Sequence, residues 1–329
     1  MPAFRLICLT AALVLASCAS RPGAELRRDG DEIMAAGRLF DTGARVVLWT
    51  EPGGYDAYRV EKRFAPWEAS QWDNEKPFAF TPNRYGLRRG VDDETRERVR
   101  GGGWTLDELR ERVDQVVLHY DASGTSRNCF RVLHDERGLS IHFMIDLDGT
   151  IYQTLDLKER AWHATVANDR SIGIEIANIG AYPPGSPTLA RWYARDEHGP
   201  RVALPSWLGD GGVRTPGFVA RPARPEPVRG VIGGRELEQY DFTPEQYEAL
   251  SRLVAALTRI FPRIEPDYPR EGPHDGGGVL TRVLTPEEFA SFRGVLGHWH
   301  IQENKVDPGP ALDWERVVAP ARRRATLTR

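Results

Sequence analysis

One segment near the carboxyl end of the chain gathers side chains that could do chemistry. Residues 297–309 contain His298, Lys305 and Asp307, together with a second histidine, His300, and end in turn-forming proline and glycine. Histidine and aspartate are both zinc ligands, and a catalytic zinc site usually takes three protein ligands and leaves a fourth position for water. This segment can supply two ligands, so we expect a third elsewhere in the chain.

Two earlier strands end in polar side chains that apolar strands do not need. Residues 115–120 (QVVLHY) form an apolar run that predicts a buried strand, with His119 near its end. Residues 171–178 (SIGIEIAN) predict another strand, whose alternation sends Glu175 and the isoleucines to opposite faces. An unpaired buried carboxylate is costly, which favours a functional role for Glu175.

These residue types suit metal-assisted hydrolysis. Two imidazoles and a carboxylate on zinc leave room for a bound water, whose pKa the metal lowers towards about 7. A further carboxylate that is not a ligand can take the proton from that water and pass it to a leaving amine. A lysine can stabilise the oxyanion of the tetrahedral intermediate. The sequence therefore predicts a metallohydrolase site.

The motifs around these residues resemble those of the zinc-dependent N-acetylmuramoyl-L-alanine amidases, a family related to phage lysozyme-type amidases and to peptidoglycan recognition proteins. The resemblance runs from about residue 115 to residue 314, apart from a proline-rich stretch. Its motifs, in chain order, are VVLHY with His119, LSIHF with His142 and the DG turn that follows, AWHA with His163, SIGIE with Glu175, and GH with His298 followed by KVDPG with Lys305 and Asp307.

The resemblance implies a fold, a cofactor and a substrate. The fold is α/β, a mixed central β-sheet flanked by helices. Zinc is held by His119, His298 and Asp307, Glu175 is the general base and acid, and Lys305 lies at the oxyanion. The implied reaction is hydrolysis of the amide between N-acetylmuramic acid and the L-alanine of the stem peptide, with peptidoglycan or muropeptides as partners.

The chain departs from the family pattern at two positions. Ile141 stands where some relatives have a tyrosine, which leaves Glu175 as the only obvious proton carrier. His300 stands where many relatives have an aspartate. Residues 293–296 predict a short apolar strand just before these histidines. On a strand, His298 and His300 would point the same way, and position favours His298 as the ligand.

Three further histidines are candidates for contacting a ligand or the substrate, namely His142, His163 and His300. The alternative for His142 and His163 is that they are core histidines satisfied by hydrogen bonds. Polar or proline-rich surroundings place His134, His198 and His274 at the surface.

The first residues predict where the protein is located in the cell. Residues 1–17 have a positive start and then an apolar run too short to span a membrane comfortably, which is typical of a secretory signal peptide. The sequence LASC ending at Cys18 resembles a bacterial lipobox, and Ala19 after it resembles lipoproteins sorted to the outer membrane. We expect a lipid anchor through Cys18 on the periplasmic side of the outer membrane. The alternative is an ordinary signal peptide with an incidental cysteine.

Beyond the signal peptide, the chain divides into three parts, and the second of them carries an insertion. Residues 18–100 form a tether and an N-terminal extension, with one strand near residues 44–50. Residues 101–318 form the amidase domain, interrupted at 179–240 by a proline-rich insertion without clear periodicity, which we expect to act as a lid or groove wall. Residues 319–329 form a basic, solvated tail. The clearest helix opens at Thr243 and Pro244.

Composition narrows the functional classes. The formal net charge of −3 over 329 residues gives no general reason to expect binding to nucleic acid. After removal of the signal peptide and lipidation of Cys18, Cys129 is the only free cysteine, so we expect a buried thiol and no internal disulfide.

Two alternative functions stay open: a non-catalytic peptidoglycan-binding protein of the same fold, and a zinc hydrolase of another amide or ester.

Overall fold

A six-stranded mixed sheet organises the chain. The computed structural model describes residues 22–72, 85–272 and 277–327. The sheet has the order β14-β5-β9-β6-β7-β3. The first four strands are mutually parallel, and β7 and β3 run opposite to them. The strands are β14 (Gly294–Gly297), β5 (Gln115–Tyr120), β9 (Ser171–Ile176), β6 (Phe143–Ile145), β7 (Ile151–Gln153) and β3 (Val46–Leu48). The predicted α/β fold with a mixed central sheet is confirmed.

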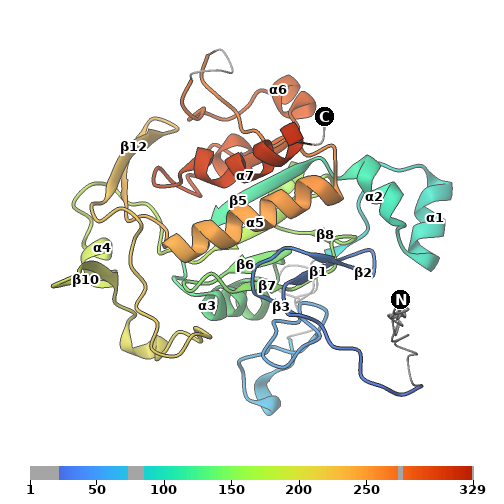
Figure 1. The fold of residues 1–329 in the computed structure, drawn as a ribbon, viewed down its shortest axis with the longest axis horizontal. Helices are drawn as coiled ribbons and strands as arrows, with labels where there is room; N and C mark the ends of the chain where they lie inside the picture. Colours follow the sequence, from blue (N-terminus) through green and yellow to red (C-terminus); the bar gives the residue numbers. More distant parts are fainter. Residues whose placement is uncertain (1–21, 73–84, 273–276, 328–329) are drawn as a thin grey trace, which may run out of the picture.

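Helices α5 (Pro244–Ile260) and α7 (Trp314–Leu327) lie side by side over one face of the sheet (Figure 1). The isoleucines of β9 and alternate residues of β5 pack in one core cluster with them. Helix α5 begins as predicted, because the Thr243 side chain accepts a hydrogen bond from the Gln246 amide and Gln246 reaches back to the Thr243 amide.

The opposite face of the sheet is covered by α3 (Ser126–Phe130) and a π-helical stretch, Arg131–Glu136, that continues it. Cys129 and Phe130 pack there against Met144 of β6 and Tyr152 of β7. Thr125 caps this helix, because its side chain accepts a hydrogen bond from the Asn128 amide. Because side chains alternate along a strand, the residues of β5 and β9 that do not face α5 point towards this side.

The segment before residue 101 belongs to the fold, although the sequence predicts a domain that starts there. Strand β3 joins the central sheet through β7, and the hairpin β1 (Glu32–Ala35) and β2 (Arg38–Asp41) packs nearby. Strand β4 (Tyr85–Gly86) pairs with β8 (Arg160–Ala161). Arg88 is buried and donates to the carbonyls of Leu157 and Ser171. Helices α1 (Asp93–Gly102) and α2 (Leu106–Arg112) then lead into β5, and a capping box of Thr105 and Glu108 opens α2.

The prediction of an irregular insertion is wrong for much of residues 179–240. Helix α4 (Pro187–Trp192) is followed by two hairpins, β10 (Tyr193–Asp196) with β11 (Gly199–Val202), and β12 (Val228–Ile232) with β13 (Arg235–Gln239). They project to one side of the sheet (Figure 1, yellow). Proline hides their periodicity but does not prevent them, because it is tolerated at the start of a helix and on the free edge of a two-stranded ribbon.

The predicted solvated tail is also wrong where the structure describes it. Residues 314–327 form α7, and Trp314, Val317, Val318 and Ala321 are buried at helical spacing. Their apolar stripe packs on the core beneath, while Arg322 of the same helix pairs with Glu315 and Asp267. The remaining helical elements are α6 (Pro286–Ser291) and the 3₁₀ turns Trp67–Ala69, Thr165–Ala167, Ser206–Leu208 and His298–His300. Within the described ranges, no helix has the length and apolar character needed to cross a membrane.

Candidate active site

Three adjacent parallel strands end at the same edge of the sheet and carry the candidate residues there. His119 of β5 lies directly opposite Glu175 of β9 in the strand register. His298 follows the last residue of β14, the other neighbour of β5. The carboxyl ends of parallel strands are a preferred place for ligands in such sheets. The fold thus brings together residues that are far apart in the sequence.

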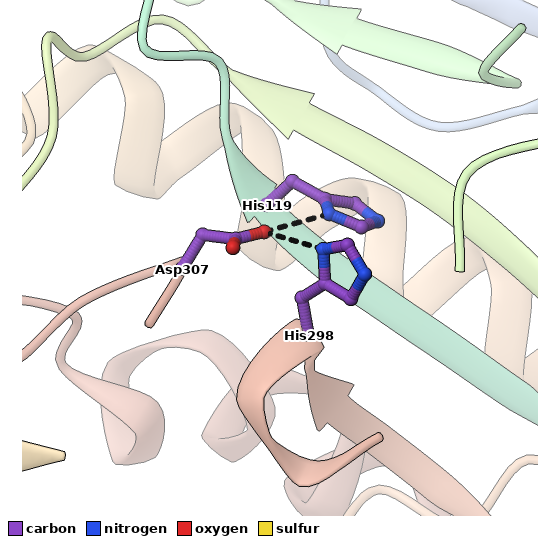
Figure 2. A group of neighbouring side chains, drawn as sticks. All are labelled: His119, His298 and Asp307. Carbon is purple, nitrogen blue, oxygen red and sulfur yellow. Dashed lines mark hydrogen bonds and ion pairs between the residues drawn. The ribbon is translucent and has the colours of Figure 1, made fainter. Parts of the chain in front are cut away.

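Asp307 meets both imidazoles at this edge. Its Oδ2 atom lies 2.8 Å from Nδ1 of His119 and 2.9 Å from Nδ1 of His298 (Figure 2). All three residues are buried, and one donor atom from each lies within 4.8 Å of the others, as a metal site requires. The loop that carries Asp307 therefore supplies the third residue of a cluster, and the other two residues come from β5 and from the end of β14.

The hydrogen-bond partner of the ring nitrogen that points away from Asp307 indicates which nitrogen of each imidazole is free to bind a metal. Nε2 of His298 lies 2.6 Å from the amide oxygen of Gln302, which can only accept, so Nε2 carries the proton and Nδ1 has a lone pair. Nε2 of His119 lies 3.1 Å from Nδ1 of His163, whose Nε2 lies 3.2 Å from the hydroxyl of Ser171. Such outer partners hold metal-binding histidines in one tautomer.

Electrostatics also suits a cation between these groups. Burial, and then the neighbouring His298, lower the pKa of His119 to about 4, so its imidazole is neutral at neutral pH. Burial alone would raise the pKa of Asp307, but His298 and His119 hold it well below its usual range. Two imidazole nitrogens and a carboxylate oxygen that converge on one point fit a zinc ion, which binds such ligands in their deprotonated form.

Glu175 lies beside this cluster with one free oxygen. Its Oε2 atom is buried and, among the described residues, has no hydrogen-bond partner. Burial, followed by repulsion from Asp307 and Asp121, raises the pKa of the Glu175 carboxyl well above its usual value. A carboxylate that holds protons more tightly than usual and faces a cavity is suited to general base and acid catalysis.

A cavity of about 270 Å³ opens onto the cluster and Glu175. One wall is formed by the loop after β5 and by α3 with its extension, including Cys129 and Arg137, and another by residues 304–307 with Lys305. Arg137 and Trp162 also line the cavity, although neither is among the predicted site residues. Trp162 lies in the AWHA motif, whereas nothing in the local sequence distinguishes Arg137 from a surface arginine. None of the described residues of the insertion lines this cavity, and the groove wall stays a prediction.

His163 and Lys305 line the cavity. A glycine in β9 makes room for the His163 ring. A Cβ on Gly173 would lie 2.7 Å from the Cγ atom of His163, closer than such contacts occur. The glycine of the SIGIE motif is therefore required by packing, whereas Glu175 two residues later points into the cavity.

His142 and His300 are core histidines, so the prediction that they contact the substrate or a ligand is wrong. Nδ1 of His142 accepts from the Gly173 amide at 3.1 Å, and its Nε2 donates to the Glu159 carbonyl at 3.0 Å. His300 accepts from the Gly297 amide at 2.9 Å and donates to the Leu280 carbonyl at 2.7 Å. Neither lines the cavity.

The strand assumed to carry His298 and His300 ends at Gly297. Residues 298–300 instead form a 3₁₀ turn, in which successive residues are rotated by about 120°. The two imidazoles consequently point in different directions. His134, predicted at the surface, is also buried, with its Nδ1 atom 2.7 Å from Oδ1 of Asp135, whereas His198 is exposed and His274 lies outside the described residues.

The fold and the donor set define a class: an α/β protein with a candidate metallohydrolase centre at the carboxyl edge of its sheet. A family model described as N-acetylmuramoyl-L-alanine amidase matches residues 109–310, more than half of the chain. The chain belongs to the N-acetylmuramoyl-L-alanine amidase family and is, by that membership, an enzyme of this kind.

Individual relatives are distant. The 1,6-anhydro-N-acetylmuramyl-L-alanine amidase AmpD of Haemophilus influenzae is 21% identical over 228 residues, which cover 67% of this chain and 73% of that protein. The structure of AmpDh3 from Pseudomonas aeruginosa with anhydromuramic pentapeptide is 22% identical, covers 63% of this chain and 58% of that one, and has a TM-score of 0.34. The structure of AmiD from E. coli with anhydro-N-acetylmuramic acid-L-Ala-D-gamma-Glu-L-Lys is 20% identical, with 63% and 57% coverage and a TM-score of 0.33.

Proposed function

We propose that this chain is a zinc-dependent amidase that hydrolyses the bond between N-acetylmuramic acid and the L-alanine of the peptidoglycan stem peptide, in cell-wall turnover or remodelling. One observation carries the proposal. The donor atoms of His119, His298 and Asp307 converge beside the unpartnered Oε2 of Glu175, at the floor of a cavity. That arrangement has a metal position, a proton acceptor and space for a substrate carbonyl together.

The residues divide the reaction between them. Zinc on His119, His298 and Asp307 would lower the pKa of a bound water towards about 7 and polarise the scissile carbonyl. Glu175 takes the proton from the attacking water and delivers it to the amine of L-alanine as the amide breaks. Lys305, from the other wall of the cavity, places its ammonium group to stabilise the oxyanion.

The family and the cavity support the substrate class. The chain belongs to a family named for this amide, and the Haemophilus relative is named for the 1,6-anhydro form of the muramyl group. A cavity of about 270 Å³ is at the small end for ligand sites. It is sized for the reacting amide and its immediate neighbours, so we propose that the remaining glycan and peptide extend along the protein surface.

Localisation is part of the proposal and rests on the sequence before residue 22. The signal peptide and the LASC sequence ending at Cys18 support a lipid anchor, and Ala19 supports sorting to the periplasmic side of the outer membrane. An anchor of several acyl chains holds a protein stably at a membrane, where a single chain does not. It would keep the catalytic domain next to the peptidoglycan layer.

Incubation of residues 19–329 with purified muropeptides, followed by mass spectrometry, tests the function. We expect release of free stem peptide, lost with a chelator and restored by zinc. Glu175→Gln should lower kcat/KM at least about 100-fold, since it removes the general base, while the bound zinc measured by metal analysis is unchanged. Intact muropeptide that binds the protein would support the non-catalytic alternative, and release of a different fragment would support a hydrolase of another amide.

A further inference from the structure

The segment that carries Lys305 and Asp307 has little regular structure of its own. After the 3₁₀ turn at residues 298–300, residues 301–313 contain no described helix or strand. Yet Asp307 is one corner of the candidate metal cluster, and both its position and that of Lys305 must be held within about half an ångström for catalysis. Some other part of the molecule therefore has to support this segment, which we call the Asp307 loop (residues 301–311).

The hairpin of β12 and β13 is in contact with the Asp307 loop at two points. Nη2 of Arg235, the first residue of β13, lies 2.9 Å from the Glu303 carbonyl oxygen and 3.1 Å from that of Lys305. Gln239, the last residue of β13, donates to the Pro308 carbonyl at 3.2 Å and accepts from the Ala311 amide at 3.1 Å. The hairpin thus binds backbone groups on both sides of Asp307.

Packing is close at the same interface. A Cβ on Gly309 would lie 2.1 Å from the side-chain oxygen of Gln239, and one on Gly230 of β12 would lie 2.7 Å from Cβ of Pro310. Gln239 is itself fully buried. The loop and the hairpin therefore approach each other more closely than side chains at either glycine would allow, which leaves the loop little freedom to move away from the hairpin.

The hairpin is in turn fixed to the strand that carries Glu175. Asn178, three residues beyond Glu175, accepts from Gln239 at 3.3 Å and donates to the Tyr240 carbonyl at 3.1 Å. Tyr182 and Glu238 exchange two backbone hydrogen bonds, of 3.0 and 2.7 Å. A continuous set of hydrogen bonds therefore runs from the end of β9, through β13, to the Asp307 loop.

We infer that the β12–β13 hairpin of the insertion is a brace that positions Asp307 and Lys305 relative to Glu175, with Arg235 and Gln239 as its positioning residues. The inference rests on the proposed function for its catalytic consequence only. It assigns the insertion a role in addition to the predicted groove wall, and none of its described residues lines the cavity. Outer contacts of this kind typically change metal affinity or activity 10–100-fold when removed.

Three variants of the chain from residue 19 test the brace. Arg235→Ala removes two hydrogen bonds of an exposed side chain. Gln239→Leu removes three buried hydrogen bonds, to Asn178, Pro308 and Ala311, at similar side-chain volume. Arg229→Ala is the matched control, because Arg229 lies on the same hairpin but pairs with Glu238 of that hairpin at 2.8 Å. Arg235→Lys keeps one charged donor and should recover part of any loss. Because Arg235 is exposed, its variant is expected to fold even if Gln239→Leu does not.

Amide hydrogen exchange over residues 301–311 is the direct readout, and zinc release to a chelator with kcat and KM on muropeptides follow. We expect exchange in the Asp307 loop to rise in Arg235→Ala and Gln239→Leu, zinc release to become about 10-fold faster or more, and kcat to fall more than KM rises. Arg229→Ala should match the wild type. Unchanged loop exchange in Arg235→Ala would overturn the brace.

The outcomes separate the brace from the proposed function. Hydrogen exchange tests the brace whether or not the protein is an amidase. If the wild type hydrolyses muropeptides but Arg235→Ala exchanges its loop and releases zinc as the wild type does, the brace alone is wrong. If the variants loosen the loop as expected but the wild type hydrolyses no muropeptide, the brace stands and the proposed function is wrong.

Discussion

At the scale of single residues, neighbouring histidines have different surroundings. His142 and His163 both belong to the motifs that resemble the amidase family, and both face β9 beside Gly173. His142 uses its two nitrogens on backbone groups in the core. His163 uses Nδ1 on His119 and lines the cavity. Their sequence context does not distinguish these two roles, because the difference depends on which groups the folded chain places opposite each ring.

The two histidines should respond differently to removal. His163→Ala deletes the outer partner of His119 and should weaken zinc binding about 10–100-fold with a smaller loss of stability. His142→Ala leaves a buried amide and a buried carbonyl without partners, so the free energy of unfolding should fall by about 2 kcal/mol or more. Zinc titration and urea unfolding measure the two effects, with His198→Ala as an exposed control. Equal loss of zinc affinity in both variants would contradict this division.

A buried acid away from the cluster should make stability depend on pH. Asp146 is fully buried, its Oδ1 accepts from the Leu147 amide at 2.9 Å, and Oδ2 has no hydrogen-bond partner among the described residues. Burial raises the pKa of Asp146 from 3.8 to about 7. A raised pKa in the folded state stabilises the fold below pH 4, and that stabilisation is lost as the pH rises towards and through 7.

Asp146→Asn should remove this dependence while keeping an oxygen for the Leu147 amide. In the wild type, the Asp146 carboxyl should lower the free energy of unfolding by up to about 1.4 kcal/mol per pH unit between pH 4 and 7. The variant should therefore be more stable than the wild type at pH 8, and the difference should shrink towards pH 4. Urea unfolding of the metal-free wild type and variant across this pH range measures the difference in free energy of unfolding. If that difference did not change with pH, the proposed effect of burying Asp146 would be excluded.

At the scale of elements, helices with caps and a clean apolar stripe are predicted well from sequence. Helix α5 begins at the predicted Thr243, and its predicted apolar positions are buried. Helix α7 is missed because Pro320 and a run of arginines obscure a pattern that packing on the core nevertheless stabilises. Strand β3 has only three residues, and its place in the central sheet follows from its pairing with β7, which local sequence does not reveal.

Strand β3 and Arg88 make contacts with the central sheet and its loops from before residue 101. A chain of residues 101–329 lacks both, so β7 loses its parallel neighbour and the buried carbonyls of Leu157 and Ser171 lose their donor. We expect it to be several kcal/mol less stable than residues 22–329, or not to fold, since each unsatisfied buried polar group costs about 1–3 kcal/mol. Urea unfolding followed by circular dichroism compares the two. The same unfolding midpoint for both chains would show that residues 101–329 are an independent domain.

At the scale of the whole molecule, the proposed membrane localisation can be tested separately from the proposed catalytic activity. Residues 1–21 lie outside the described structure, and the site is formed entirely by later residues. We expect Cys18→Ala in the full chain to shift the protein from the membrane fraction to the periplasmic fraction, because the acyl chains supply the membrane affinity. Immunoblots of fractionated cells measure this. Retention of the variant in the outer-membrane fraction would contradict anchoring through Cys18.

The sequence by itself determined the residue types and the local elements. His119, Glu175, His298, Lys305 and Asp307 can be selected because polar groups at strand ends or in turn-rich loops are conspicuous against an apolar pattern. The central strands and α5 follow from periodicity and capping, which depend on neighbours only a few residues away. The family resemblance supplies the roles expected of these residues.

Only the tertiary structure decided which of these residues meet. It separates His298 from His300 because β14 ends at Gly297 and the next residues turn. It places His163 rather than His142 behind His119, and it sets Arg235 and Gln239 of the insertion against the Asp307 loop. These contacts join positions tens to hundreds of residues apart. Local propensity carries no information about them, because they depend on strand order and on the packing of the complete chain.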